Sequence, residues 1–297
     1  MKMKNVLFFF LFGMILLILS ACNDEKKTTT IEDDPYKAYY DISYGEYDRN
    51  VLDLYMPKEV KGDSIILFIH GGAWIAGDKS FYKDYMEKLA LIGIPSMSIN
   101  YRYISQDTRL YDILDDIDAS VSFIKEYAKT EFDLELNKMA LFGYSAGAHL
   151  SLLYGNKYKN TSKIEPKFIV SMAGPVDLTM DSYYQSDLAY TLFSYMIGKK
   201  FNSETKDTVK EDLLDISPIK YIYNDSIPAI IVQGLKDTTV SPDNATLLCS
   251  KLEENNVPYE YIELPNSDHM LQNDKDILAS LLTAVYNYAV LYLNYKF

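Results

Sequence analysis

Residues 139–148 read Met-Ala-Leu-Phe-Gly-Tyr-Ser-Ala-Gly-Ala, and this stretch decides the fold. The apolar run Met139–Phe142 is followed at once by the turn Gly-Tyr-Ser-Ala-Gly at 143–147 and by a helix-like stretch that begins near Ala148. This order predicts a buried strand, a tight turn and a helix, with Ser145 at the exposed tip of the turn. Small residues at 143 and 147 let the strand and the helix approach each other. A serine in such a turn is a candidate nucleophile.

Outward from this turn, short apolar runs alternate with longer helix-patterned stretches. The predicted strands are Val51–Tyr55, Ile65–Ile69, Ile94–Ile99, Met139–Phe142, Phe168–Met172, Ala229–Val232 and Tyr259–Leu264. Several are continuous runs of Val, Ile, Leu and Phe, as strands buried on both faces require. The pattern predicts an α/β fold, with a mainly parallel central sheet flanked by helices, in a single domain spanning residues 39–297.

Two long helices are predicted between and after these strands. One apolar face recurs at steps of three and four residues, formed by Ile113, Ile117, Val121, Ile124 and Ala128. The C-terminal stretch Asp276–Leu293 is the second helix. A shorter helix-like segment, Ala245–Leu252, contains Cys249, which we expect to be a small buried apolar residue.

Ser145 needs a base to take its proton, because a serine hydroxyl is a poor nucleophile at neutral pH. The chain has three histidines. His70 follows an early strand and His149 lies one helical turn after Ser145, so neither occupies the position expected of the base. His269 follows the last predicted strand, in a loop from which it can reach Ser145.

A carboxylate must orient that histidine, and Asp237 follows the strand Ala229–Val232. The resulting order along the chain is Ser145, Asp237, His269. Asp268 is the nearest competitor, but as the immediate neighbour of His269 it is poorly aimed at the imidazole.

Backbone N–H groups must receive the negative charge that develops on a carbonyl oxygen under attack. Gly71 and Gly72 follow the strand Ile65–Ile69, where a glycine pair can expose its amides to a ligand. We expect donors from this Gly71-Gly72 pair, and a further donor from Ala146, the residue after the serine.

The chain resembles the bacterial feruloyl and acetyl-xylan esterase group, in the hormone-sensitive-lipase-like branch of the α/β-hydrolases. The resemblance covers most of residues 45–290 and is carried by His70–Lys79, Asn100–Arg102, Gly143–Leu150, Ser217-Pro218, Gly234–Pro242 and His269. It implies an α/β-hydrolase fold, catalytic residues Ser145, Asp237 and His269, oxyanion donors from Gly71 to Ala73 and from Ala146, and no cofactor.

The chain departs from the group at two positions: Ala73 and Asp268 stand where glycine is frequent. The resemblance also implies structural roles for His70 and His149, which pack and form hydrogen bonds beneath the oxyanion loop. The functional expectation is a serine carboxylesterase that deacylates acylated carbohydrate or similarly small esters.

Three alternatives remain. The segments around His70 and Ser145 also resemble kynurenine formamidases, which cleave an amide. A short-peptide hydrolase is disfavoured, because no propeller-sized domain precedes the fold. A non-catalytic glycan-binding lipoprotein would have no physical need for the serine, aspartate, histidine and oxyanion turn together, so these residues favour catalysis.

The N-terminus contains a predicted targeting segment. Lys2 and Lys4 precede an apolar run from Val6 to Leu19, which is shorter than the ~20 residues of a membrane span. The run ends in Leu-Ser-Ala-Cys at 19–22, which resembles a bacterial lipobox. We therefore expect a signal peptide at 1–21, lipid on Cys22 and a flexible tether at 22–38. The expected location is the cell envelope, on a periplasmic or cell-surface face of a membrane.

Charge argues against nucleic acid as a partner. The formal net charge is −13, and residues 1–21 contain two lysines and no acid, so the chain from Cys22 onward carries −15. The sequence has no His-Glu-x-x-His motif, cysteine cluster or phosphate-binding glycine loop, so we expect no metal and no cofactor.

Replacing Cys22 by serine tests the lipid anchor, because only a cysteine can carry the lipid. We expect Cys22→Ser to move the protein out of the membrane fraction of fractionated cells. A variant that stays in that fraction with residues 1–21 uncleaved would identify the segment as a transmembrane anchor instead.

Overall fold

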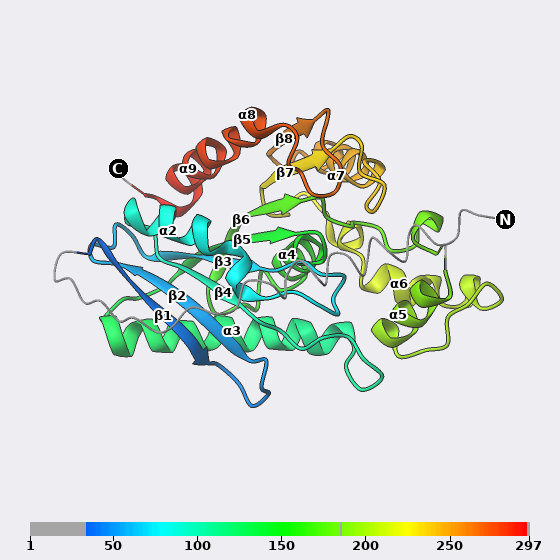
Figure 1. Ribbon diagram of the computed structural model, residues 1–297, viewed down its shortest axis with the longest axis horizontal. Coiled ribbons are helices and arrows are strands. Elements are labelled where there is room, and N and C mark those ends of the chain that lie inside the picture. Colours follow the sequence, from blue (N-terminus) through cyan, green and yellow to red (C-terminus); the bar gives the residue numbers. More distant parts are fainter. Residues whose placement is uncertain (1–33, 185, 296–297) are drawn as a thin grey trace. The chain divides into compact units, whose positions relative to one another are not determined.

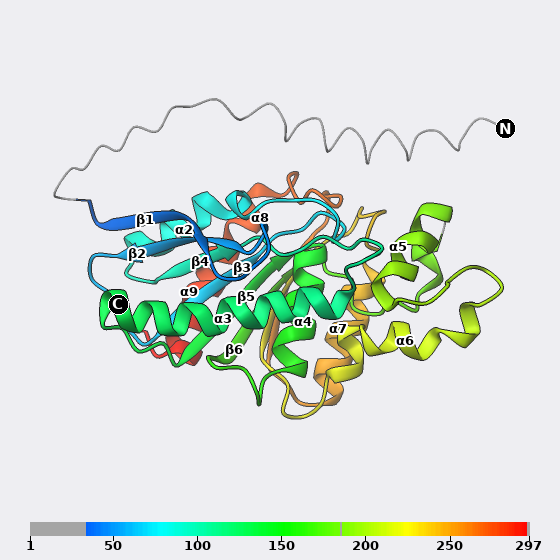
Figure 2. The ribbon, with the colours of Figure 1, turned by 90° about the horizontal axis from the view of Figure 1, so that it is seen from below.

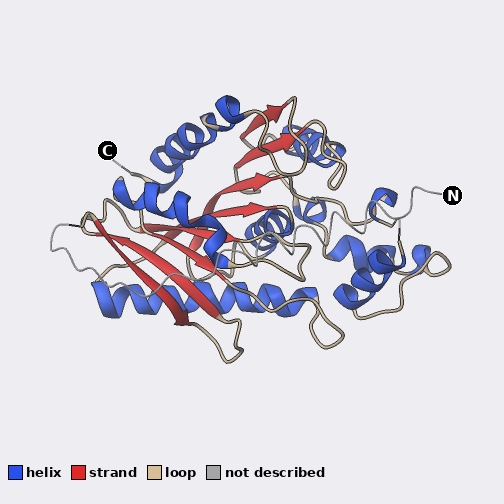
Figure 3. Ribbon diagram, in the orientation of Figure 1, coloured by secondary structure: helices blue, strands red, loops and turns tan. Residues whose placement is uncertain are grey.

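The strand that leads to Ser145 lies in the middle of a mixed sheet. In the computed structural model, which describes residues 34–184 and 186–295, eight strands pair in the order β1-β2-β4-β3-β5-β6-β7-β8. Figure 3 shows this sheet between two layers of helices. The strands are β1 (Tyr36–Ser43), β2 (Val51–Pro57), β3 (Ser64–Ile69), β4 (Ser96–Ile99), β5 (Lys138–Tyr144), β6 (Glu165–Met172), β7 (Ala229–Gly234) and β8 (Tyr259–Leu264). The α/β-hydrolase fold predicted above is confirmed.

Strand direction brings the candidate site together. β2 runs antiparallel to both of its neighbours, whereas β4, β3, β5, β6, β7 and β8 pair in parallel. The carboxyl ends of β3, β5, β7 and β8 therefore meet at one edge of the sheet, where ligands bind in open α/β sheets. The loops that carry the predicted site residues all leave from this edge.

Helices cover both faces of the sheet (Figures 1 and 2). One face packs against α2 (Lys83–Leu91) and α9 (Ser280–Leu293), and the other against α3 (Leu110–Phe132), α4 (Ala146–Lys157) and α7 (Asp243–Glu254). The segment between β6 and β7 contributes α5 (Asp187–Ile197) and α6 (Lys210–Asp215). The short elements are α8 (Lys275–Leu278) and the 3-10 turns η1 (Lys79–Tyr82), η2 (Asp181–Tyr183), η3 (Lys206–Thr208) and η4 (Pro218–Tyr221).

The predicted apolar stripes are the helix faces that pack on the sheet. Ile113, Ile117, Val121, Ile124 and Ala128 of α3 are all fully buried. Burying a side chain of this size contributes about 1.5–3 kcal/mol for each large aliphatic residue, so this stripe fixes α3 on the sheet. Cys249 is buried in α7, as expected of a small apolar residue.

Several boundaries differ from the sequence prediction: β4 begins at Ser96 rather than Ile94, β6 begins at Glu165 rather than Phe168, and two further differences lie near the ends of the fold. β1 begins at Tyr36, so the expected tether at 22–38 is wrong in its last three residues, and the fold begins before residue 39. β1 is an edge strand with a mixed burial pattern, and its side chains lack the apolar run of the inner strands. The predicted helix Asp276–Leu293 is interrupted at Ala279, between α8 and α9. The predicted signal peptide and Cys22 lie outside the described residues.

Within the described part of the chain, Lys275–Leu293 is long and apolar enough to cross a membrane. Core helices pass the same test of length and composition. Here Leu281, Val285 and Leu293 are buried in the layer that α9 shares with α2, so this helix is a covering element of the sheet.

Gly147 lies where no side chain fits. A Cβ atom added to it would lie 1.9 Å from the carbonyl oxygen of Ile69, at the end of β3. A Cβ added to Gly155, two turns later in α4, would meet side-chain atoms, of which the Cδ1 atoms of Ile169 and Leu141 are nearest at 2.8 and 2.9 Å. The side-chain ends of Ile169 and Leu141 can rotate away, whereas the backbone carbonyl of Ile69 cannot.

We therefore predict that Gly147→Ala lowers the free energy of unfolding by about 3 kcal/mol or more. Gly155→Ala is the matched control in the same helix, and the better helix propensity of alanine, worth up to about 1 kcal/mol, should offset its small repacking cost. Urea unfolding of both variants measures the difference. Equal stabilities would show that β3 and α4 are not in close contact.

Candidate active site

Ser145 occupies a strained turn between β5 and α4. Its backbone angles are φ 54° and ψ −121°, and its N–H donates to the carbonyl of Met172 at the end of β6, at 2.8 Å. A non-glycine residue with positive φ is costly, by about 1–3 kcal/mol, and persists where the surroundings enforce it. The turn holds the Ser145 side chain at the carboxyl edge of the sheet.

His269 and Asp237 complete a hydrogen-bonded chain to this serine. His269 Nε2 lies 3.0 Å from Ser145 Oγ, and His269 Nδ1 lies 2.7 Å from Asp237 Oδ2. Because the carboxylate is an acceptor, Nδ1 carries the proton and Nε2 is left to accept the one from the serine. The structure thus brings together the three residues that the sequence analysis selected.

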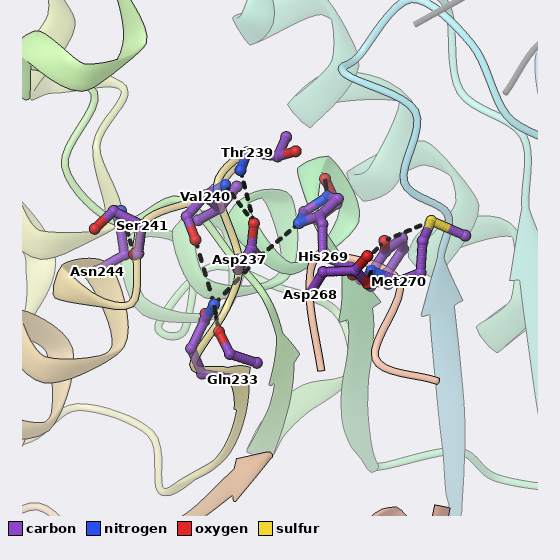
Figure 4. Close-up of polar contacts among 12 residues, drawn as sticks. Gln233, Asp237, Thr239, Val240, Ser241, Asn244, Asp268, His269 and Met270 are labelled. Atoms are coloured by element: carbon purple, nitrogen blue, oxygen red, sulfur yellow. Dashed lines mark hydrogen bonds and ion pairs between the residues drawn. The ribbon is translucent and has the colours of Figure 1, made fainter. Parts of the chain in front are cut away.

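Asp237 is held by donors on its other side (Figure 4). Its Oδ1 accepts from the N–H groups of Thr239 and Val240 at 2.8 and 2.9 Å, and the Gln233 amide lies 3.2 Å from Oδ2. The carboxylate is fully buried. These contacts aim one oxygen at the imidazole and keep the side chain from rotating.

Asp268 points elsewhere. Its Oδ1 accepts from the N–H of Met270 at 3.0 Å, in a local turn, and the residue is exposed. The geometry therefore gives the orienting contact with His269 to Asp237.

The loop that carries His269 is fastened by Asp274, a residue the sequence analysis missed. Asp274 accepts from Ser267 Oγ at 2.7 Å and from both the backbone and the side chain of Asn266. Burial opposes ionisation of Asp274, but the hydrogen bonds from Ser267 and Asn266 hold its pKa below the ordinary value. No local pattern marks such a residue, because its partners are recognisable only once the loop is folded.

The predicted oxyanion segment forms a left-handed loop beside the serine. Gly72, Ala73 and Trp74 have φ of 114°, 50° and 60°. A Cβ added to Gly71 would lie 3.3 Å from the Cβ of Ser145, so this loop borders the nucleophile. Ala73 adopts the left-handed backbone that favours glycine, at a cost of about 1–2 kcal/mol. Ala146 begins α4, so its N–H has no acceptor within the helix.

His149 holds the oxyanion loop through a hydrogen bond to Trp74. Trp74 Nε1 donates to His149 Nδ1 at 3.2 Å, and His149 Nε2 donates to the carbonyl of Ile216 at 2.8 Å. Burial lowers the pKa of His149 to about 4, so the ring is neutral at pH 7 and can accept from the indole. This is the structural role that the resemblance implied.

His70 fastens the other end of the loop. Its Nδ1 lies 2.7 Å from the Gly71 carbonyl, its Nε2 lies 3.3 Å from Arg49, and its ring stacks on Tyr101 with centroids 4.3 Å apart. Burial lowers the pKa of His70 to about 4, although the bond to Gly71 favours the charged form. His70 and His149 therefore support the loop as neutral rings, while the imidazole of His269 lies within hydrogen-bond distance of the Ser145 hydroxyl.

The arrangement can transfer an acyl group. An imidazole poised to accept the serine proton, a buried carboxylate behind it and backbone amides beside it are the parts that nucleophilic acyl transfer requires. Among the described residues, no group of three or more His, Cys, Asp or Glu side chains is arranged to hold a metal ion.

Fold and site together define an α/β-hydrolase. The family model BD-FAE matches residues 52–252, which is more than half of the chain. The chain belongs to the BD-FAE family.

Three curated relatives are similar to this chain. The probable isoprenylcysteine alpha-carbonyl methylesterase ICME of Oryza sativa subsp. japonica is 32% identical over 181 residues, covering 55% of this chain and 43% of that protein. Esterase LipC of Mycobacterium tuberculosis is 24% identical, covering 77% and 58%. The kynurenine formamidase of Meyerozyma guilliermondii is 24% identical, covering 74% and 82%. The chain spans about half the length of the first two.

Two solved structures share the fold. A bifunctional GH43-CE protein of Bacteroides eggerthii superposes with a TM-score of 0.71 at 21% identity, covering 85% of this chain and 38% of that one. A truncated carbohydrate esterase from gut microbiota also gives a TM-score of 0.71, at 19% identity, covering 87% and 98%.

The two candidate acids can be separated by mutation. We predict that Asp237→Asn lowers kcat for a small ester such as ethyl acetate by about 10⁴-fold, the loss that the equivalent change causes in serine proteases, because the amide no longer fixes the imidazole tautomer. Asp268→Asn should keep most of the activity, because the Asp268 carboxylate is exposed and solvent-screened. Steady-state kinetics of both variants provide the test. Comparable losses in both variants would leave the acid that orients His269 unassigned. A severe loss in Asp268→Asn alone would assign that role to Asp268.

Proposed function

We propose that this protein is a serine carboxylesterase that removes acyl groups, acetyl or feruloyl, from carbohydrate esters. The observation that carries the proposal is the unbroken chain of contacts from Ser145 through His269 to Asp237, at 3.0 and 2.7 Å. A residue set with these distances has the geometry for proton transfer from the hydroxyl as it attacks.

In the first half-reaction, Ser145 Oγ attacks the ester carbonyl while His269 Nε2 takes its proton. The carbonyl oxygen becomes negative and is received by the N–H groups of the loop at Gly71–Ala73 and of Ala146. Asp237 stabilises the imidazolium formed at His269. The imidazolium then gives its proton to the departing alcohol, and the acyl group stays on Ser145.

The second half-reaction repeats these steps with water. His269 takes a proton from a water molecule, which attacks the acyl-serine and forms a second negative oxygen in the same amide loop. Collapse returns the proton to Ser145 and releases the carboxylic acid. The cycle needs no cofactor, because water is the second acceptor.

Carbohydrate is the preferred alcohol component for two reasons. The sequence resembles the feruloyl and acetyl-xylan esterase group, and both structural neighbours described above carry carbohydrate-esterase descriptions. The segment between β6 and β7 adds an aromatic cluster in which the buried Phe193 lies against Trp74 of the oxyanion loop and Tyr183, beside Phe193, is partly exposed. Aromatic side chains combine a large apolar face with polar groups at the rim.

We also propose that lipid on Cys22 holds the enzyme in a bacterial cell envelope. Support comes from the charged start, the apolar run and the Leu-Ser-Ala-Cys sequence at 19–22. With a net charge of −15 beyond the signal peptide, the protein surface itself should bind anionic lipid poorly.

An amide-cleaving formamidase is the second candidate. It is favoured by the likeness to the Meyerozyma guilliermondii kynurenine formamidase over most of that protein's length. The same residues can cleave an activated amide, so the choice depends on the substrate rather than on the catalytic groups.

A comparison of substrates distinguishes the two candidates. The purified protein is assayed with acetylated xylo-oligosaccharide, methyl ferulate, an octanoyl ester and N-formylkynurenine. We predict the highest kcat/KM for the acetyl or feruloyl ester, and a loss of up to about 10⁶-fold in kcat for Ser145→Ala, as nucleophile deletion causes in serine proteases. A preference for N-formylkynurenine would replace the esterase by the formamidase. Binding of xylo-oligosaccharide without turnover of any of the four would favour a glycan-binding protein.

A further inference from the structure

One exposed aromatic ring lies close to the catalytic histidine and has no part in the mechanism above. Phe81, in η1, is 59% exposed. Its ring stacks on Tyr144 with centroids 5.8 Å apart and planes 14° from parallel, and it meets Tyr82 edge-on at 5.0 Å. One face of Phe81 is thus held by Tyr144, so its exposed area belongs to the other face and the edge.

Tyr144 connects Phe81 to the catalytic loop. The Tyr144 hydroxyl donates to the carbonyl of His269 at 2.7 Å, and the two rings lie 5.2 Å apart. The same hydroxyl lies 3.9 Å from Met270 Sδ, and Met270 is 42% exposed. Phe81 and Met270 are therefore two exposed apolar side chains that contact the buried Tyr144 beside His269, and we call these three residues the aromatic shelf. Figure 4 shows Met270 extending from the loop on the side of His269 away from Asp237.

Exposure alone would mean little, since single apolar residues are common on protein surfaces. The shelf differs because its rings are fixed in place before any ligand arrives. Phe81 is held by two aromatic contacts, and Tyr144 by the strand β5 and the hydrogen bond to His269. A ligand that stacks on Phe81 loses little protein conformational entropy in doing so.

The place of the shelf decides which part of the substrate it contacts. His269 must give its proton to the oxygen of the leaving alcohol, so that alcohol lies beside the imidazole. The shelf adjoins the imidazole through Tyr144 and Met270, and so it borders the alcohol side of the ester.

Charge favours a neutral alcohol over an acidic one. Two carboxylates lie near the shelf, Asp237 behind the imidazole of His269 and the exposed Asp268 beside it, and both raise the pKa of the buried Tyr144. Their repulsion would weakly disfavour an acidic ring, because solvent screens Asp268, whereas a neutral ring would meet no repulsion. A neutral sugar ring offers one face of C–H groups to an aromatic side chain and hydroxyls to the water around it.

We propose that the aromatic shelf is the subsite for the alcohol part of the substrate, and that Phe81 stacks against a neutral sugar ring. This inference rests on the proposed carbohydrate-esterase function, because that function supplies the sugar. Phe81 is then a specificity-determining residue that contacts substrate away from the reacting atoms.

Binding tests the subsite without turnover. Full-length protein carrying Ser145→Ala is titrated with xylotriose, with or without Phe81→Ala, and the fluorescence of Trp74 or the heat of binding is recorded. We expect Phe81→Ala to weaken binding about tenfold, which corresponds to about 1.4 kcal/mol. Phe81→Tyr keeps the ring and should bind like the parent. Tyr223→Ala is the control for an exposed aromatic residue at the opposite edge of the sheet, before β7, since Tyr223 is 54% exposed.

Turnover then tests the alcohol side. With Ser145 intact, Phe81→Ala should lower the ratio of kcat/KM for acetylated xylo-oligosaccharide to that for ethyl acetate by about tenfold, mainly through KM. The two substrates share the acyl group and differ in the alcohol, so the ratio isolates the subsite.

The outcomes separate this inference from the proposed function. Equal affinity for xylotriose in the Ser145→Ala proteins with and without Phe81→Ala overturns the proposed subsite, even if every ester is cleaved by the parent. Weakened affinity without ester turnover by the parent supports the subsite and refutes the esterase. Phenyl acetate is assayed as a third substrate with the same acyl group, and a loss in Phe81→Ala confined to it would assign the shelf to an aryl alcohol and overturn the sugar assignment. Thermal melting of Phe81→Ala confirms that the variant is folded.

Discussion

The close packing of the end of β3 against the start of α4, beneath Ser145, is the constraint on which the rest of the site depends. The carbonyl oxygen of Ile69, at the end of β3, lies so near Gly147 that a Cβ there would come within 1.9 Å of it. This contact fixes the start of α4 against the strand that leads into the oxyanion loop. Because Ser145 lies two residues earlier, one contact sets the spacing between Ser145 and the amides at Gly71–Ala73. Ser145 itself has a positive φ of 54°, in the turn between β5 and α4.

Three histidines of the same chain perform different tasks because their surroundings differ. His70 and His149 are buried, and burial keeps them neutral, so each can accept one hydrogen bond and donate another to hold the loop between them. His269 instead lies between a buried carboxylate and the serine hydroxyl. The amides of Thr239 and Val240 fix Asp237, Asp237 fixes the imidazole, and the imidazole meets Ser145. Each group in this chain of contacts is held by the group before it, so the side chains of Asp237, His269 and Ser145 are restrained in one arrangement.

Local sequence was enough to predict the inner strands, the face of α3 and the three residues that meet at the carboxyl edge of the sheet. These features are encoded within short stretches: an apolar run, a period of three or four, or a serine between small residues. The three residues are far apart along the chain, but they lie close together in the fold because β5, β7 and β8 all end at the same edge of the sheet.

The features that the sequence did not predict depend on contacts between distant segments. β1 has no apolar run of its own and is a strand because it pairs with β2. Asp274 matters only because the chain folds back to bring Ser267 and Asn266 to it. Tyr144 could be placed in the serine turn, but its bond to His269 spans 125 residues. Likewise, nothing near Phe81 in the sequence indicates that its ring lies on Tyr144.

The central claim is that Ser145 is the activated nucleophile, and covalent labelling tests it most directly. The full-length protein is treated with a fluorophosphonate probe, digested, and the modified residue is located by mass spectrometry. The account predicts one adduct, on the oxygen of Ser145, which forms rapidly because His269 removes the proton. An adduct on a different serine, or an unlabelled Ser145 in folded protein, would contradict it.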